Sequence, residues 1–129
     1  SQLKKIDVFL AKRQQIANYY LTQLQDIPGL VLPIVIEGVK MGWHLFVVRI
    51  DKEIRREAFE KMRQGGIGVQ VHYIPVYRHP YYRKNGYKKI YLDNTEKYYQ
   101  TAISLPIYPE LKKDEQDYVI QKLLSFLNK

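Results

Sequence analysis

The chain has 129 residues, which suits a single domain spanning residues 1–129. Hydrophobic residues make up 46% and charged residues 26%, a balance that excludes an intrinsically disordered chain. The absence of Cys excludes disulfides and cysteine nucleophiles, and three His without clustered carboxylates predict no metal site. No apolar run approaches the roughly 20 residues of a membrane span, and no signal peptide is visible, so we expect a cytoplasmic protein.

Positive charge is concentrated in one part of the sequence. Lys and Arg number 21 against 13 Asp and Glu, a net charge of +8, yet residues 61–92 contain no acidic residue at all. The same window holds seven Lys and Arg and six of the twelve Tyr. Such a segment attracts phosphate in a nucleic acid, a nucleotide or an anionic cofactor. A basic surface loop without a ligand is the simpler alternative.

The beginning of the chain is expected to form one long helix. Within residues 1–25, apolar side chains recur at three- and four-residue steps and make a single stripe, and Pro28-Gly29 ends the element. Apart from Ser1 the helix has no start signal, and the chain has no initiator Met. We therefore expect residues 1–25 to be a linking helix that follows an earlier domain of a larger protein.

Three stretches have the character of strands. Residues 30–36 are apolar and β-branched but contain Pro33, which limits them to an edge strand. Residues 43–50 are apolar on both faces, and residues 67–74 alternate in hydrophobicity. Between these two, Asp51 is expected to cap a helix that runs through residue 64, and Gly65-Gly66 to close it with a positive φ.

The second half of the chain combines a long loop with two helices. Residues 75–92 show no clear period and are expected to be an ordered loop, longer than most connections. A short helix is expected at 94–101, capped by Asp93 or Asn94. An extended piece at 104–108 and a helix at 113–127 follow. The fold class is therefore α+β, a small, mostly antiparallel sheet with helices on one side.

The loop after residue 74 is the best candidate for a binding site. Pro75 and Pro80 stiffen it, and its Tyr rings offer flat faces to a base or a sugar. The same mixture of aromatic and basic residues is typical of a platform for single-stranded nucleic acid.

Other possible motifs carry little chemistry. The glycines at 65–68 do not form a phosphate loop, because they connect a helix to a strand rather than a strand to a helix. His44 and His79 have no carboxylate or nucleophile in a pattern that predicts a catalytic triad. A lone His in a strand, such as His72, is more often structural than catalytic.

Five segments in order along the chain are similar to one known family. They are residues 3–19, HLFVVRID at His44–Asp51, residues 56–69 with GIGV at their end, HYIPVY at His72–Tyr77 with Pro80–Tyr82, and Glu96 with SLPIYP at Ser104–Pro109 and residues 117–120. They resemble the C-terminal part of the DegT/DnrJ/EryC1/StrS family, sugar aminotransferases that use pyridoxal phosphate. The resemblance runs along nearly the whole chain. It implies the C-terminal small domain of the fold-type I aminotransferase fold.

The resemblance also implies an activity. Residues 68–75 look most like the enzymes of pseudaminic acid biosynthesis, which transfer an amino group from glutamate to C4 of a UDP-linked 4-keto-6-deoxy-N-acetylhexose. It implies a homodimeric full-length enzyme that binds pyridoxal 5'-phosphate, the nucleotide sugar and glutamate. The family's Schiff-base Lys and cofactor-binding residues belong to a large N-terminal domain outside the matched motifs. The chain alone is therefore expected to be inactive, with no catalytic residue of its own.

The family's substrate-side loop supplies the candidate site residues. We expect it to bind the nucleotide sugar through residues at one rim of a cleft, namely His72, Tyr73, Tyr77, Arg78 and Tyr81. Either Arg78 or Arg83 is expected to meet a diphosphate. Many family members have His where this chain has Tyr77, so no catalytic role is expected there. The alternative is a stand-alone nucleic-acid-binding module built on the basic, Tyr-rich loop; for the aminotransferase, neither a specific nucleic acid nor a membrane is expected as partner.

Overall fold

Two short antiparallel strands, β1 (Phe46–Arg49) and β2 (Ala102–Leu105), lie at the centre of the computed structural model, which describes residues 2–127. Their register places Phe46 opposite Leu105. Two isolated antiparallel bridges widen the pair, one from Val31 to β1 and one from Gln70 to β2. The expected small antiparallel sheet is therefore confirmed.

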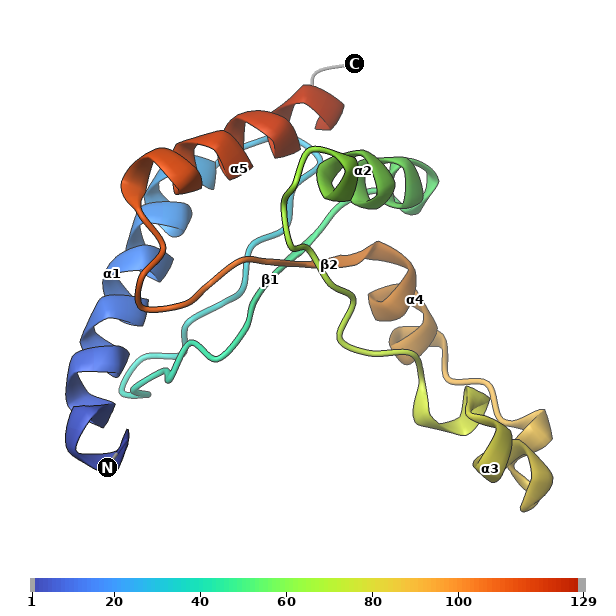
Figure 1. The fold of residues 1–129 in the computed structure, drawn as a ribbon. Coiled ribbons are helices and arrows are strands. Elements are labelled where there is room, and N and C mark those ends of the chain that lie inside the picture. The colour runs from blue at the N-terminus through green and yellow to red at the C-terminus, as the bar shows by residue number, and fades with distance from the viewer. Residues whose placement is uncertain (1, 128–129) are drawn as a thin grey trace.

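Three helices lie along one side of these strands, so that the ribbon forms an arch (Figure 1). They are α1 (Ile6–Leu24), which follows a 3-10 turn at Gln2–Lys5, α2 (Lys52–Gln64) and α5 (Lys113–Leu127). α5 packs against both α1 and α2. The α+β class predicted from the sequence is confirmed.

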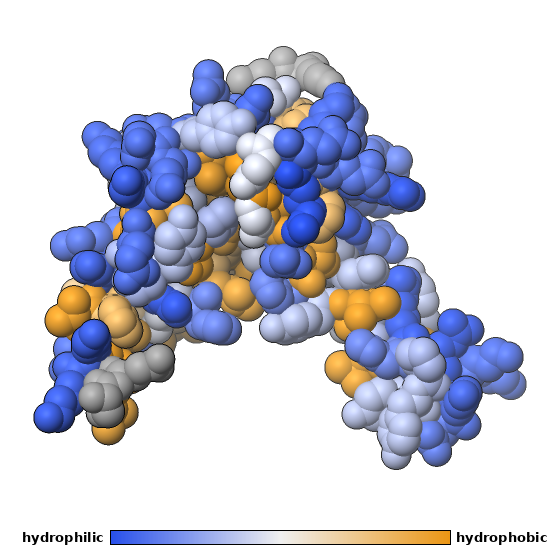
Figure 2. All heavy atoms as spheres, viewed as in Figure 1, coloured by the Kyte–Doolittle hydropathy of each residue, from blue (hydrophilic) through white to orange (hydrophobic). Residues whose placement is uncertain are grey.

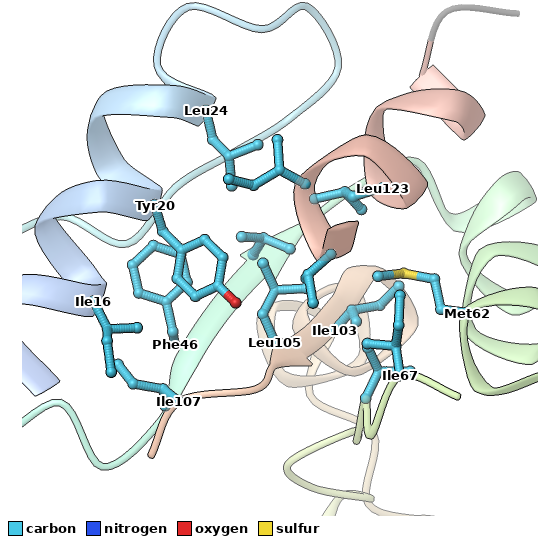
Figure 3. Close-up of a cluster of buried hydrophobic side chains, with 14 of the residues drawn as sticks. Ile16, Tyr20, Leu24, Phe46, Met62, Ile67, Ile103, Leu105, Ile107 and Leu123 are labelled. Carbon is cyan, nitrogen blue, oxygen red and sulfur yellow. The ribbon is translucent and has the colours of Figure 1, made fainter. Parts of the chain in front are cut away.

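The core fills the space between the strands and these helices, and Figure 3 shows its side chains converging from both. The rings of Tyr20 and Phe46 lie 5.0 Å apart between centroids, and the Tyr20 hydroxyl donates a hydrogen bond to the carbonyl oxygen of Pro106 over 3.1 Å. The Gln116 amide donates to the Ile16 carbonyl oxygen over 3.1 Å, which ties α5 to α1. The Tyr20 hydroxyl and the Gln116 amide are thus both paired in the core.

Both ends of α2 lie where the sequence predicts them. The Asp51 carboxylate accepts a hydrogen bond from the backbone N–H of Glu53 over 2.7 Å, as expected of an N-cap. Gly66 has a φ of +79°, and the N–H of Ile67 bonds back to the Met62 carbonyl oxygen over 3.0 Å. This positive φ lets the chain reverse from α2 toward β2.

The segment at residues 76–92, called the arm below, extends away from the strands (Figure 1). It contains 3-10 turns at Val76–Arg78 and Tyr87–Lys89 and the short helix α3 (Pro80–Lys84) between them. The sequence predicts an ordered loop here and misses these turns, because none is long enough to show a period. α4 (Asp93–Thr101) leads from the arm back to β2.

The strands are shorter than the sequence predicts. The expected edge strand at 30–36 is reduced to the single bridge at Val31, and the strand at 43–50 to Phe46–Arg49. The prediction of a strand at 67–74 is wrong, since only Gln70 forms a bridge with β2. The N–H of Val69 bonds the Ile67 carbonyl oxygen and turns the backbone there. The extended piece expected at 104–108 begins at Ala102 as β2.

Two helix starts also differ. α1 begins at Ile6, and residues 2–5 form a 3-10 turn, whereas Ser1 lies outside the described residues. α4 begins at Asp93 after Leu92, without a side-chain cap, so the caps expected from Asp93 or Asn94 are wrong. The predicted helix at 113–127 is confirmed at both ends.

Core packing makes a first prediction. The Leu123 side chain is fully buried, so Leu123→Ala is expected to lower the free energy of unfolding by about 2 to 5 kcal/mol through lost contacts and a residual cavity. The neighbouring Leu124 is only half-buried, so Leu124→Ala is the control and is expected to cost less. Urea denaturation measures both; equal losses would contradict this core arrangement.

Candidate functional site

Two hollows lie where the sequence predicts binding residues. The first has a volume of about 750 Å³ and lies between β2, the residues around Gln70 and the start of α5. The second has a volume of about 390 Å³ and lies at the base of the arm beside α4. Each holds a different part of the predicted set.

His72 lines the first hollow and is held by β2. Its Nδ1 lies 2.8 Å from the Oγ of Ser104, whose backbone also exchanges hydrogen bonds with Gln70. The ring of the next residue, Tyr73, meets the imidazole edge-on at 4.6 Å and is otherwise exposed. The peptide bond between them is cis. The sheet therefore fixes the position of His72, while Tyr73 faces outward.

The chemistry of the first hollow does not suit an anion. Its lining contains the carboxylates of Asp114 and Glu115 and no Lys or Arg. Glu115 accepts a hydrogen bond from the backbone N–H of Lys112 over 2.8 Å at the start of α5. Burial, and then the charges of Glu115 and Glu110, raise the pKa of Tyr108, which lines the same hollow. A phosphate group would meet repulsion here.

Glu96 lines the second hollow. Its side chain is buried, with 1% of its surface exposed, and it comes from α4. The carboxylate accepts hydrogen bonds from the Tyr77 hydroxyl over 2.7 Å and from Arg78 Nε over 2.9 Å, and it also contacts Arg78 Nη2. The Arg78 guanidinium lies over the ring of Tyr99 at 5.4 Å. A buried carboxylate is thus fully paired.

Tyr77 stands between Glu96 and the end of the arm. Its hydroxyl oxygen accepts a hydrogen bond from the backbone N–H of Leu92 over 3.4 Å while it donates to Glu96. Partial burial, and then the bond to Glu96, raise the pKa of Tyr77 above its ordinary value. The phenol therefore keeps its proton as a donor at neutral pH.

The structure separates the predicted site residues into groups. His72 lines the first hollow, whereas Tyr77 and Arg78 line the second together with Arg83 and Lys88. Tyr81 is 70% exposed on α3, its ring edge-on to that of Tyr82. Among residues 2–127, Arg78 has an ion pair with Glu96 and Arg83 has none. Arg83 is thus the better placed of the two for a diphosphate, and substrate binding by the set remains a prediction.

Sequence reasoning did not assign a role to Glu96. The signal was present but weak: Asp93 and Glu96 are the first carboxylates after the acid-free window, and Glu96 lies on the inward face of a short helix. A buried Glu needs a partner, and the preceding window offers several cations, although Lys97 is nearer along the chain.

Comparison with known proteins identifies the family. Residues 1–124 match the DegT/DnrJ/EryC1/StrS aminotransferase family. The chain belongs to this family. It is 40% identical over 126 residues to the Bacillus subtilis spore coat polysaccharide biosynthesis protein SpsC, covering 93% of the chain and 32% of SpsC. It is 33% identical over 132 residues to the Campylobacter jejuni UDP-4-amino-4,6-dideoxy-N-acetyl-beta-L-altrosamine transaminase, covering 100% of the chain and 35% of that enzyme.

Solved structures agree with this assignment. Helicobacter pylori PseC, an aminotransferase involved in the biosynthesis of pseudoaminic acid, matches with a TM-score of 0.89 and 26% identity over 99% of this chain and 35% of PseC. DesV of S. venezuelae, solved with a ketimine intermediate, matches with a TM-score of 0.88 and 30% identity over 98% of this chain and 34% of DesV. The chain therefore spans about a third of the length of these relatives.

The family depends on pyridoxal phosphate, and NtdA of Bacillus subtilis, 29% identical to the chain, was solved with bound cofactor PMP. The residues of this chain do not by themselves fit that cofactor. The first hollow has carboxylates but no cation for the phosphate. The second has Arg83 and Lys88, but Glu96, the one carboxylate in its lining, is already paired and cannot serve the pyridine nitrogen. The cofactor-binding residues are not identified in this chain.

Within residues 2–127, no group of three or more His, Asp or Glu side chains could hold a metal ion. No helix in the same range is long and apolar enough to span a bilayer.

The raised pKa of Tyr77 makes a second prediction. Because the folded-state pKa lies above the ordinary 10.0, the stabilisation from the neutral phenol is present below about pH 10 and is lost as the pH rises through the folded-state pKa. Tyrosinate absorbance of the wild type minus that of Tyr77→Phe isolates this phenol. Its midpoint is expected above 10.0, and Glu96→Gln should move it back toward that value. A midpoint at or below 10.0 in the wild type would contradict the Tyr77–Glu96 contact.

Proposed function

We propose that residues 1–129 are the C-terminal small domain of an aminotransferase that transfers an amino group from glutamate to a nucleotide-linked 4-keto-6-deoxy sugar. One observation carries this proposal: the whole chain aligns with a transaminase named for a UDP-linked amino-dideoxy sugar, at 33% identity. The structural likeness to PseC supports the same substrate class. Bound pyridoxal phosphate would supply the carbonyl-to-amine chemistry.

In this proposal the chain's own residues bind and orient the nucleotide sugar. Arg83 and Lys88 line the second hollow and provide positive charge for a diphosphate. The exposed rings of Tyr73 and Tyr81 offer stacking faces for a base or a sugar. His72, held by Ser104, provides a ring nitrogen at a fixed place for a hydrogen bond to the ligand. These residues hold the substrate, and the reacting groups come from the rest of the enzyme.

Three further features belong to the same proposal. The chain spans about a third of its relatives, so we expect it to be inactive alone and to complete the site together with an N-terminal domain. The full-length enzyme is proposed to be a homodimer and to act in the cytoplasm. Glutamate is the proposed amino donor.

One observation favours a second function. The arm is exposed and has no acidic residue, and Figure 2 shows mostly hydrophilic residues on it at the lower right. This also suits a platform for single-stranded nucleic acid. The family assignment favours the aminotransferase. Tight binding of an oligonucleotide at physiological salt, lost in Tyr81→Ala, would favour the nucleic-acid module instead.

The third prediction tests the substrate role of His72. In the full-length enzyme, His72→Ala is expected to lower transaminase activity by about tenfold or more, because a ligand contact is lost. Ser104→Ala is the matched control: it removes the same hydrogen bond, with a similar stability cost of about 1 kcal/mol, but keeps the imidazole.

Activity is measured as 2-oxoglutarate formed from glutamate with a UDP-linked 4-keto-6-deoxy sugar, and stability by thermal unfolding. Ser104→Ala should keep most of the activity that His72→Ala loses. If His72→Ala instead loses stability and keeps its specific activity, His72 is structural and the site assignment fails. A wild-type enzyme that is inactive with nucleotide sugars would overturn the proposed function itself.

A further inference from the structure

The two ends of the arm meet at one buried carboxylate. Tyr77 and Arg78 lie at its start and Leu92 at its end, and the hydroxyl of Tyr77 bonds both Glu96 and the Leu92 N–H. The backbone N–H of Glu96 also bonds the Leu92 carbonyl oxygen over 2.9 Å as the first turn of α4 forms. Glu96 therefore holds the base of the arm closed.

The rest of the arm is packed mainly on itself. Every side chain from residue 79 to residue 94 is exposed. α3 packs against the 3-10 turns on either side of it, and the ring of Tyr82 meets those of Tyr81 and Tyr87 within the arm. With so little buried contact beyond its base, the position of the arm depends on the bonds made at Glu96.

Pairing with Glu96 also sets which cations remain for a ligand. Arg78 gives its Nε and Nη2 to the Glu96 carboxylate and one guanidinium face to the Tyr99 ring, so its charge is paired with a buried carboxylate although 39% of its own side chain is exposed. The pair fixes geometry because the Glu96 carboxylate is buried, and a buried charge left without its partner would be costly. Arg83 and Lys88 are left to face the second hollow.

We propose that Glu96 is a positioning residue for the nucleotide sugar: it fixes the arm so that Arg83 and Lys88 converge on the diphosphate. This inference rests on the proposed function and adds to it the residue that orders the binding surface. Glu96 does not touch the substrate, and its effect passes through Tyr77 and Arg78. The loss of its charge should therefore weaken substrate binding more than it slows the chemical step.

The test uses the full-length enzyme and the variant Glu96→Gln. The KM for the nucleotide sugar is expected to rise by about tenfold or more, while kcat and the KM for the amino donor change by less than about threefold. Glu60→Gln is the matched control, since it removes the same charge from an exposed pair with Arg56, whose Nε lies 2.8 Å from Glu60. It is expected to leave all three constants unchanged.

Two further readouts separate positioning from general damage. Arg83→Ala is expected to raise the same KM. The double variant with Glu96→Gln should have a KM no higher than that of the single variant with the higher KM, because the arm's cations act only when the arm is held in place. Hydrogen exchange in peptides covering residues 79–91 should be faster in Glu96→Gln, with exchange in α2 and α5 unchanged.

Each outcome decides the inference. An active enzyme in which Glu96→Gln leaves the KM and the exchange of the arm unchanged would overturn it while the proposed function stands. Additive effects of Glu96→Gln and Arg83→Ala would also overturn it. If Glu96→Gln does not fold, Tyr77→Phe removes one of the bonds to the same carboxylate and must show the same pattern, at smaller size. If the wild type shows no nucleotide-sugar activity, faster arm exchange supports the positioning role of Glu96 and only the ligand assignment fails.

Discussion

Hydrogen-bonded pairing on both edges of β2 determines where the functional residues of this chain lie. One edge pairs with β1 in antiparallel register, and the other exchanges two hydrogen bonds between Ser104 and Gln70. All four residues of β2 are buried, so the strand can be solvated on neither face. The segment that pairs with the outer edge of β2 leaves the sheet at His72, two residues after Gln70. The His72 ring is hydrogen-bonded to the Ser104 side chain. The base of the arm follows directly from this pairing.

The distribution of charge then determines which cations of the arm pair with Glu96 and which face the second hollow. The window at residues 61–92 has no carboxylate to neutralise its cations, so the one that Glu96 supplies from α4 has a large effect. It pairs with Arg78, whereas Arg83 and Lys88 beside the second hollow have no ion pair within residues 2–127. Cations that line the same hollow repel one another, and a bound doubly charged anion reduces that repulsion. Arg83 and Lys88 are therefore the cations that we propose for a diphosphate, in a segment with little core of its own.

Local signals predicted much of the fold, and tertiary contacts account for the rest. The Asp51 cap and the apolar stripe of residues 113–127 are encoded within a few residues, so α2 and α5 were predicted correctly. The strand expected at 67–74 failed because Ile67 and Val69 alternate as strand residues do but are buried individually, on either side of a backbone turn. Pro80 at the first position of α3 was a usable start signal, yet five residues show no period. The role of Glu96 was not predicted because its partners lie 18 and 19 residues away, beyond any local pattern. The family was recognisable from motifs, whereas the division of the site residues between two hollows required the structure.

The most direct test of this account is a crystal structure of the full-length enzyme with its nucleotide sugar bound. We expect the side-chain nitrogens of Arg83 and Lys88 to lie within hydrogen-bond distance of diphosphate oxygens, with Glu96 still bonded to Tyr77 and Arg78. A diphosphate bound away from the arm, or one held by an Arg78 that has left Glu96, would contradict it.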